Sequence, residues 1–349
     1  EEILARCFEE VVGSAPSSVE TLRPHASERR IYRLTHAGSS LVGVVNASRA
    51  ENEAFVALAR HFRRLGLPVP AIHAYKAELG VYLEDDLGDE TLLDLLEAAR
   101  AQTGEAFPAQ AQAAYQTAIE ALPRFQIEAA ATLDFSVCLA AQSDFSQTLK
   151  RDFQSFVTEF VARVLPAFDR HRLDADFQAL TSFLSEARSG YFLYRDFQAR
   201  NIMMVKGSPV FIDFQSGTKG PLHYDVASIL FQSSAQIPDS FRESLLESYL
   251  AAGTRYAAVS RDDFLRRYPA FIVSRMLQVL SVYGRQGLGQ KKEYFTRSIP
   301  LALATLSRPR VTCTGSPPRG LTVDSCTMPP SSRARYAIRD PSGLDRSQC

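Results

Sequence analysis

The stretch YFLYRDFQARNIMM, residues 191–204, places a cluster of polar side chains between two apolar runs. Asp196 follows the first run and Asn201 comes five positions later, while a third apolar run, PVFIDF, contains Asp213. Short apolar runs of this kind, bounded by polar residues, predict buried strands that carry loops. We therefore expect two short strands whose loops present Asp196, Asn201 and Asp213 as a spaced set of oxygen ligands.

These three side chains are suited to phosphoryl transfer. Hard divalent cations such as Mg²⁺ are held by one or two carboxylate or amide oxygens together with phosphate oxygens and water. The reaction also needs a carboxylate that orients and deprotonates the attacking hydroxyl. Asp and Asn favour turns as well, so a pair of Asx-rich turns at the ends of core strands is the alternative. The spacing and the later Asp225, in YDVASIL, favour the site.

The composition limits the classes of partner. The 349-residue chain has 39 Lys and Arg residues against 39 Asp and Glu residues, so no overall basic field attracts nucleic acid or a membrane surface. It contains no run of about 18 apolar residues, and its N-terminus, EEILARCFEE, lacks the order of a signal peptide. The cysteines form no CxxC pair, which argues against a zinc or disulfide framework. We expect a cytoplasmic protein with a small-molecule ligand and with no nucleic-acid or membrane partner.

Two parts of the chain differ in periodicity. Residues 1–87 combine short apolar runs with one clear amphipathic helical pattern, whereas residues 88–307 consist mainly of helical patterns. The elements expected in the first part are a hairpin at 29–35 and 40–45, a helix at 51–66, and strands at 70–75 and 80–86. The sequence therefore predicts an α+β protein, with a small N-terminal lobe of antiparallel sheet and one helix, and a larger, mainly helical C-terminal lobe.

The last part of the chain, residues 308–349, changes abruptly in composition. It is rich in Pro, Arg, Ser, Thr and Cys and has no hydrophobic periodicity. A segment of this composition does not bury a core of its own. We expect residues 308–349 to be a disordered or non-native tail.

The polar cluster also resembles the signature of a known family. The residues that carry the match are Tyr194, Arg195, Asp196, Asn201, Ile212 and Asp213. Their order resembles the motifs H-G-D-x-x-x-x-N and I-D of the aminoglycoside phosphotransferase and choline kinase superfamily, a branch of the protein kinase-like fold. The resemblance spans roughly residues 20–300. It implies a two-lobe fold that uses ATP and Mg²⁺.

The resemblance also implies a role for each matching residue. Asp196 would be the catalytic base, and Asn201 and Asp213 would hold the metal ions on the ATP phosphates. Tyr194 stands where the family has His, and it would keep a packing and hydrogen-bonding role because Tyr offers a ring and a hydroxyl. Asp225, in the position of the family's D-x-A helix start, would brace the catalytic loop.

Two kinase features are missing from the part of the sequence that would bind the nucleotide. The strand SLVGVV has no Lys where kinases place the residue that pairs with the α- and β-phosphates, and no G-x-G-x-x-G loop is present. In the segment HASERRIYR, Ser27 and nearby backbone amides would cradle phosphate, and Arg29 or Arg30 would supply charge. The residues expected to offer backbone contacts to adenine are Glu84, Asp85 and Leu87.

The acceptor is implied by the resemblance alone. The segments SERRIYRL, EDDLGDETL and YRDFQARNIM look most like bacterial kinases that phosphorylate the anomeric hydroxyl of N-acetylmuramic acid and N-acetylglucosamine. They look still more like a group in which this module is fused to a C-terminal RNase-adaptor-like domain, so a fused or partner C-terminal domain, missing here, is an expectation of the resemblance. The candidate contacts to substrate or phosphate are Arg195, Gln198, Arg200 and Gln215, for which a solvated or ion-paired structural role is an equal alternative.

Two functions stay open from the sequence. The first is an ATP- and Mg²⁺-dependent phosphotransferase with a hydroxyl acceptor, and the second is a non-catalytic regulatory module of the same fold that binds nucleotide or sugar. The missing Lys and Gly-rich loop favour the second, whereas the presence of Asp196, Asn201 and Asp213 together favours the first. We expect the enzyme, because a regulatory module has no need of all three residues.

Overall fold

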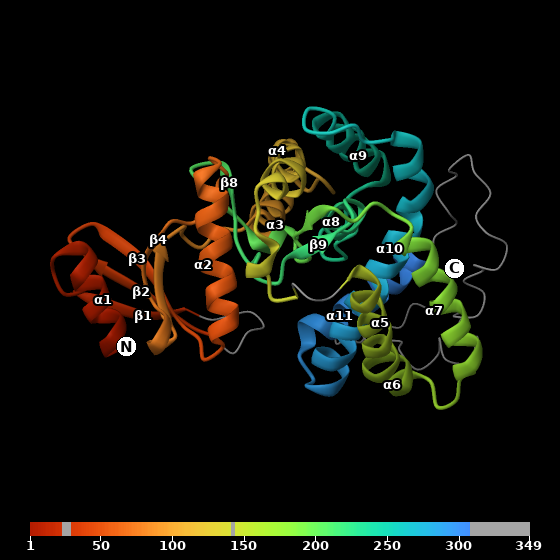
Figure 1. The fold of residues 1–349 in the computed structure, drawn as a ribbon, viewed down its shortest axis with the longest axis horizontal. Coiled ribbons are helices and arrows are strands. Elements are labelled where there is room, and N and C mark those ends of the chain that lie inside the picture. Colours follow the sequence, from red (N-terminus) through yellow and green to blue (C-terminus); the bar gives the residue numbers. More distant parts are fainter. Residues whose placement is uncertain (23–28, 141–143, 308–349) are drawn as a thin grey trace, which may run out of the picture.

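The computed structural model of the chain describes residues 1–22, 29–140 and 144–307. They form two lobes, and Figure 1 shows one as a sheet between a red helix and an orange helix and the other as a mainly helical body. This arrangement confirms the predicted two-lobe α+β fold. The predictions made for Ser27 and for residues 308–349 lie outside the described residues.

The N-terminal lobe is built on a five-stranded antiparallel sheet with the strand order β1-β2-β3-β5-β4. Its elements are α1 (Glu2–Val12), β1 (Ser18–Leu22), β2 (Arg30–His36), β3 (Ser39–Val45), α2 (Arg49–Arg64), β4 (Ile72–Lys76) and β5 (Val81–Asp85). The predicted hairpin is β2 and β3, the predicted helix is α2, and the two further strands are β4 and β5. Helix α1 and strand β1 come in addition to the elements predicted for this lobe.

The two faces of the sheet have different neighbours. Leu34 of β2 is buried with Leu4 and Phe8 of α1. Tyr82 of β5 packs on Phe55 of α2, with ring centroids 5.2 Å apart. Because side chains alternate along a strand, α1 covers one face and α2 covers the other. Helix α2 therefore lies between the sheet and the C-terminal lobe (Figure 1).

Helix α2 begins and ends at residues that the sequence marks. The Ser48 side chain caps its N-terminus by accepting a hydrogen bond from the Glu51 amide. The chain turns away at Gly66, whose φ of 68° is strained for any side chain but free of cost for glycine. From the buried face of the helix, Phe55 stacks on Phe214 of the C-terminal lobe at 4.9 Å. The helix thus packs against both lobes.

The C-terminal lobe wraps helices around two short strand ladders. Its helices are α3 (Leu92–Thr103), α4 (Ala109–Pro123), α5 (Phe145–Phe156), α6 (Ala162–Val164), α7 (Arg170–Ser185), α8 (His223–Leu230), α9 (Asp239–Gly253), α10 (Arg261–Tyr283) and α11 (Glu293–Leu306). Its strands are β6 (Tyr191–Leu193), β7 (Ile202–Val205), β8 (Ser208–Phe211) and β9 (Thr218–Gly220), paired as β6 with β9 and β7 with β8. Strands β6 and β8 were predicted, whereas their partners β9 and β7 were not.

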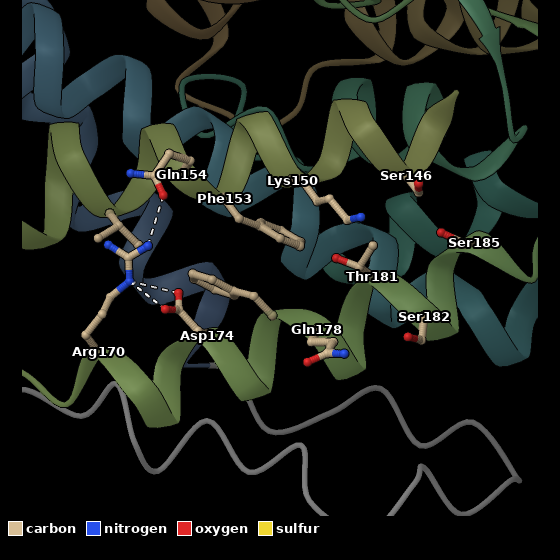
Figure 2. Close-up of a pocket in the computed structure, with 12 residues that line it drawn as sticks. Ser146, Lys150, Phe153, Gln154, Arg170, Asp174, Gln178, Thr181, Ser182 and Ser185 are labelled. Carbon is tan, nitrogen blue, oxygen red and sulfur yellow. Dashed lines mark hydrogen bonds and ion pairs between the residues drawn. The ribbon is translucent and has the colours of Figure 1, made fainter. Parts of the chain in front are cut away.

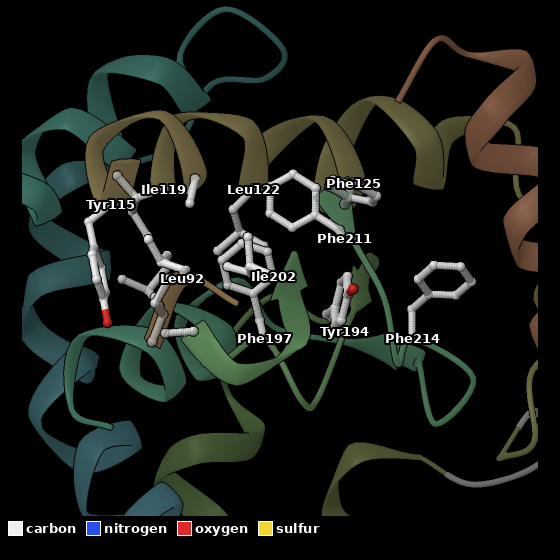
Figure 3. Close-up of a cluster of buried hydrophobic side chains, with 14 of the residues drawn as sticks. Leu92, Tyr115, Ile119, Leu122, Phe125, Tyr194, Phe197, Ile202, Phe211 and Phe214 are labelled. Carbon is white, nitrogen blue, oxygen red and sulfur yellow. The ribbon is translucent and has the colours of Figure 1, made fainter. Parts of the chain in front are cut away.

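A buried apolar cluster supports the two ladders. Leu122 and Phe125, at and just beyond the end of α4, pack with Phe197, Ile202 and Phe211 (Figure 3). The rings of Phe125 and Phe211 lie edge to face with centroids 5.0 Å apart. A close-packed interior of this kind resists small displacements. The cluster therefore fixes the positions of the loops that leave the strands.

His223, the first residue of α8, predicts how stability depends on pH. Its ring is stacked between Phe264 and Phe271, at 4.1 and 4.5 Å, and burial lowers its pKa to about 3. In the unfolded chain the His223 imidazole has its ordinary pKa of 6.5. The stability that the neutral, buried ring gives the folded protein is therefore complete above pH 6.5, and it is lost as the pH falls toward 3. We expect urea unfolding to show up to about 1.4 kcal/mol lost per pH unit below 6.5. His223→Phe, which keeps the stacking, should be less acid-sensitive, and equal acid sensitivity in both proteins would contradict the assignment.

The two lobes are joined by the short segment between β5 and α3. The domain boundary predicted at residue 87 falls in this segment and stays a prediction. Among the described residues, no helix is both long enough and apolar enough to cross a membrane.

Candidate functional site

Strand pairing brings the three predicted oxygen ligands together. Strands β7 and β8 pair with Ile202 opposite Phe211, and the Ile212 amide donates to the backbone oxygen of Asn201 at 3.1 Å. Asn201 and Asp213, the residue after Ile212, therefore come close. Asn201 Nδ2 donates to Asp213 Oδ2 at 3.2 Å and to the backbone oxygen of Asp196 at 2.9 Å. The side chains predicted for catalysis and metal binding therefore form one cluster in the loops that follow β6 and β8.

Asp225 of α8 holds the loop that carries Asp196. Its fully buried carboxylate accepts hydrogen bonds of 2.8 Å from the backbone amides of Tyr194 and Arg195 and from Gln126 Nε2. Burial raises the pKa of Asp225 to about 6, while the hydrogen bonds from Tyr194, Gln126 and Arg195 favour its charged form. The carboxylate thus fixes the backbone immediately before Asp196.

Two residues of the site have strained backbones. Arg195 has a φ of 72° and Asp213 a φ of 65°, in the left-handed region that residues with a side chain adopt only at a cost. Such strain persists where surrounding contacts outweigh it, and it is concentrated at functional sites. For Arg195, the bond from its amide to Asp225 is one such contact.

Tyr194 links the loop that carries Asp196 to the residue before Asp213 by a hydrogen bond. Its hydroxyl donates to the backbone oxygen of Ile212 at 2.7 Å. Its buried ring meets Phe125 and Phe197 edge to face, with centroids 5.8 and 5.2 Å away (Figure 3). Tyr194 therefore makes both the packing contact and the hydrogen bond that were expected of it.

The Asp196 carboxylate is held on both oxygens but stays accessible. Ser216 Oγ donates to its Oδ2 at 3.1 Å, and Gln198 Nε2 makes a long contact of 3.5 Å to its Oδ1. Arg275 Nη2 lies 3.9 Å from the same Oδ1. The Asp196 side chain is 33% exposed, so an acceptor hydroxyl can reach it.

The two arginines predicted to supply charge lie on different faces of the sheet. Arg29 Nη2 pairs with Asp213 Oδ1 at 2.9 Å and with Glu51 Oε1 of α2 at 3.7 Å. Arg30 is exposed at the start of β2, on the face away from α2, and lines a surface pocket together with Arg49. The structure therefore brings Arg29 into contact with Asp213, while the role of either arginine at the phosphates stays a prediction.

The segment predicted to contact adenine contains two acidic residues, Glu84 and Asp85, whose side chains have different surroundings. Burial raises the pKa of Glu84 to about 8, against the opposing effect of the nearby Arg29, so its carboxyl is mostly protonated at neutral pH. The Asp85 carboxylate contacts β4, accepting from the Ala71 amide at 2.8 Å and meeting His73 Nε2 at 2.7 Å. Leu87 is half-buried in the connection that follows. The Asp85 side chain is thus occupied, whereas Oε2 of Glu84 has no partner among the described residues. The backbone contacts of this segment to adenine stay a prediction.

Two of the residues predicted to contact substrate lie against Asp213 and Asp196. Gln215 Nε2 donates to Asp213 Oδ1 at 2.7 Å, while its buried Oε1 has no partner among the described residues. Gln198, also buried, makes the long contact to Asp196. Gln215 is therefore part of the cluster, and Gln198 lies beside it.

The two predicted arginine contacts differ. Arg195 reaches Asp152 of α5 in a long hydrogen bond of 3.4 Å, with its side chain 21% exposed. Arg200 is close enough to Tyr283 to lower the pKa of that hydroxyl, against the larger raising effect of burial. Arg195 therefore contacts α5, whereas Arg200 lies near Tyr283 at the end of α10.

Several residues of the site carry no signal in the sequence. Asp152 and Arg275 lie far from Arg195 and Asp196 along the chain, and their contacts depend on the packing of α5 and α10. Ser216, whose Oγ donates to Asp196, is the exception, since it directly follows Gln215 in the segment DFQSG. Its neighbour Gly217 is required by space, because a Cβ there would clash with the Phe192 ring.

A cavity of about 580 Å³ lies apart from this cluster, between α5 and α7. Figure 2 shows its polar lining, with Lys150 and Gln154 from α5 facing Arg170, Asp174 and Thr181 from α7. None of the residues predicted for the site lines it. The cluster around Asp196 is therefore the candidate active site.

The comparison with known proteins decides the family. Residues 18–259 match the model of the phosphotransferase enzyme family. The chain belongs to this family. The predictions of a phosphotransferase, of a small-molecule kinase and of ATP as the phosphoryl donor are confirmed at this level.

Individual relatives agree with the family. The N-acetylmuramate/N-acetylglucosamine kinase of Pseudomonas aeruginosa is 28% identical over 279 residues, which cover 77% of this chain and 77% of that protein. The protein of the same name from Pseudomonas putida is 28% identical over 282 residues, 78% of each chain. The structure of choline kinase LicA from Streptococcus pneumoniae has a TM-score of 0.57 at 11% identity, covering 88% of this phosphotransferase and 98% of that chain. The solved structure supports the fold alone.

Proposed function

We propose that this phosphotransferase uses Mg²⁺ and ATP to phosphorylate a hydroxyl group of an amino sugar, with Asp196 as the catalytic base. The observation that carries the proposal is the cluster in which Asn201 bonds both the Asp196 backbone and the Asp213 carboxylate. A pair of unrelated turns gives no reason for that convergence. We also propose that the reaction takes place in the cytoplasm, where ATP is supplied, and the fused or partner C-terminal domain stays a prediction.

In the proposed reaction, the acceptor hydroxyl lies against the exposed side of Asp196. Its oxygen forms a bond to the γ-phosphorus, and the bond from that phosphorus to the oxygen bridging to the β-phosphate breaks, releasing ADP. The hydroxyl proton passes to the Asp196 carboxylate. Ser216, which donates to Oδ2, restricts the rotation of the carboxylate during this transfer.

The residues present fit a magnesium ion that is shared with the nucleotide. In the part of the chain that the structure describes, no cluster of three or more His, Cys, Asp or Glu side chains could hold a metal by itself. Asn201 and Asp213 supply one amide and one carboxylate, the small oxygen set that Mg²⁺ uses together with phosphates and water. The Arg29 guanidinium pairs with the Asp213 carboxylate, so the surroundings of this carboxylate already accommodate a positive charge. When bound, the ion would offset charge on the phosphate oxygens.

Arg29 is proposed to take the place of the missing strand Lys. It directly precedes β2, whose first residue pairs with the last residue of β3, and it bridges Glu51 of α2 and Asp213, as the kinase Lys meets the helix Glu. From this position its guanidinium can contact the α- and β-phosphates of ATP.

Replacing Arg29 by Gln should weaken ATP binding by about 10-fold or more, the loss of a charge-assisted contact to phosphate. Adenosine, which lacks phosphates, should bind the variant as it binds the wild type. Arg30→Gln removes an equal charge from the other face of the sheet and should leave both affinities unchanged. Calorimetric titration of the three proteins measures these constants, and a loss in Arg30→Gln instead would assign the phosphate contact to Arg30.

The amino sugar as acceptor is supported by the two Pseudomonas relatives, whose names state N-acetylmuramate and N-acetylglucosamine. The test is ADP formation by the full chain with Mg²⁺ and ATP, in separate reactions with N-acetylmuramic acid, N-acetylglucosamine, glucose, choline and an aminoglycoside. We expect turnover with an amino sugar and none with choline. Turnover with choline or the aminoglycoside alone would refute the acceptor, and ATP binding without turnover would favour the regulatory module.

A further inference from the structure

Arg275, in the middle of α10, is a buried cation beside Asp196. Its side chain is 3% exposed. One guanidinium nitrogen, Nη1, donates to Gln278 Oε1 at 2.6 Å and to the Tyr224 hydroxyl at 3.2 Å. The other, Nη2, lies 3.9 Å from Asp196 Oδ1. The guanidinium is therefore fixed by α8 and α10, and its second nitrogen faces the proposed base.

The charges around Arg275 come from three elements. Asp196 lies in the loop after β6, Asp152 lies on α5, and Asp225 lies on α8. Arg195 is the other cation, and its guanidinium approaches the Tyr224 ring at 6.0 Å, while Arg275 approaches the same ring at 5.4 Å. Asp152 is hydrogen-bonded to Arg195 and Asp225 to backbone amides. Asp196 is the carboxylate that forms an ion pair with Arg275.

We propose that Arg275 is a positioning residue that holds the Asp196 carboxylate in the orientation needed to receive the acceptor proton. This inference rests on the proposed function. Arg275 is too deeply buried to contact an acceptor, so it acts through Asp196. A charge within about 4 Å in a poorly solvated site interacts more strongly than it would in water. Ser216 restrains one carboxylate oxygen and Arg275 the other, which leaves the exposed edge of the carboxylate to the substrate.

A structural role alone is the competing explanation, because a buried guanidinium that bonds Tyr224 also ties α10 to α8. The two explanations differ in what they change. Loss of a structural tie lowers the stability of the lobe. Loss of a positioning charge lowers kcat at temperatures where the protein is folded and leaves the KM values for ATP and acceptor nearly unchanged.

The test compares Arg275→Gln and Arg275→Lys with a control on the same helix. Arg275→Gln should lower kcat by about 10- to 100-fold, the effect of a misplaced catalytic group, with less than about a threefold change in either KM. Arg275→Lys keeps the charge and should recover part of kcat. Arg267→Gln also removes a buried guanidinium from α10, one that pairs with Glu186 and Asp263, and should leave kcat unchanged. Equal losses of kcat in Arg267→Gln and Arg275→Gln would overturn the proposal.

A measurement that needs no activity separates this inference from the proposed function. The free energy of unfolding is measured for the wild type, Arg275→Gln, Asp196→Asn and the double variant. If Arg275 interacts with Asp196, Arg275→Gln should change the free energy of unfolding less in the Asp196→Asn background than in the wild type. Additive effects would overturn the inference. A wild type with no turnover on any acceptor would refute the proposed function, while this cycle would still decide whether the two side chains interact.

Discussion

Replacing Asp196 by Asn is expected to lower kcat by about 100- to 10,000-fold, the range for removal of a general base. An amide keeps the shape of the side chain but does not take the acceptor proton. Asp196 is 33% exposed and is not one of the groups placed against the ATP phosphates, so the affinity for ATP should stay within about threefold of the wild type. Initial rates and calorimetric titration with ATP measure the two quantities.

The matched control for this variant is Asp174→Asn. Asp174 lies on α7 in the cavity of Figure 2 and pairs with Arg170, so the same chemical change is made away from the cluster. Its kcat should equal that of the wild type. Activity at the wild-type level in Asp196→Asn would remove Asp196 from the reaction.

Replacing Asp213 by Asn should produce the second large effect, a loss of at least about 100-fold in kcat/KM in the presence of Mg²⁺. The carboxylate is proposed to hold the ion on the phosphates, and an amide is a weaker ligand for a hard cation. The variant should also lose most of the gain in ATP affinity that Mg²⁺ gives the wild type. Titration of ATP in the presence of Mg²⁺ and in the presence of a chelator measures that gain.

The chelator measurement also serves as a control within the same variant. Without Mg²⁺, the wild-type Asp213 carboxylate repels the phosphates, so Asp213→Asn should bind ATP as tightly as the wild type or more tightly. The metal dependence is therefore expected to be lost while the nucleotide site stays intact. An unchanged gain from Mg²⁺ in the variant would contradict the metal-binding role.

The lobes could be predicted from the sequence wherever an apolar pattern was strong. The hairpin of β2 and β3 and helix α2 have clear periodicity, and the structure confirms them. Strand β1, with the sequence SVETL, is exposed along most of its length, so no apolar alternation marked it. Strand β7 is buried on both faces, and its run IMMV reads as part of the loop that precedes it. Pairing with a neighbour, rather than local pattern, defines both strands.

The candidate site was predictable where its residues are close in sequence. Asp196, Asn201 and Asp213 lie within 18 positions, and pairing of β7 with β8 brings them together. Because side chains alternate along an extended chain, Arg29 and Arg30 are expected on opposite faces of the sheet. The sequence alone does not tell which of the two faces meets the C-terminal lobe. That choice depends on α2 packing against Phe214, a contact between the lobes.

Residues that act from distant helices could not be predicted. Arg275 is 79 positions from Asp196 and lies within a 23-residue helix that contains several arginines. Nothing local separates it from Arg267, which points to different partners on the same helix. Only the packing of α10 against α8 shows that Arg275 is the arginine that faces Asp196.

The most direct test of the account is to identify the product by ³¹P NMR and mass spectrometry after the full chain has been incubated with ATP, Mg²⁺ and N-acetylmuramic acid or N-acetylglucosamine. We expect ADP and a sugar phosphate in equal amounts from the wild type, and neither above background from Asp196→Asn. Bound ATP with no sugar phosphate from the wild type would contradict it.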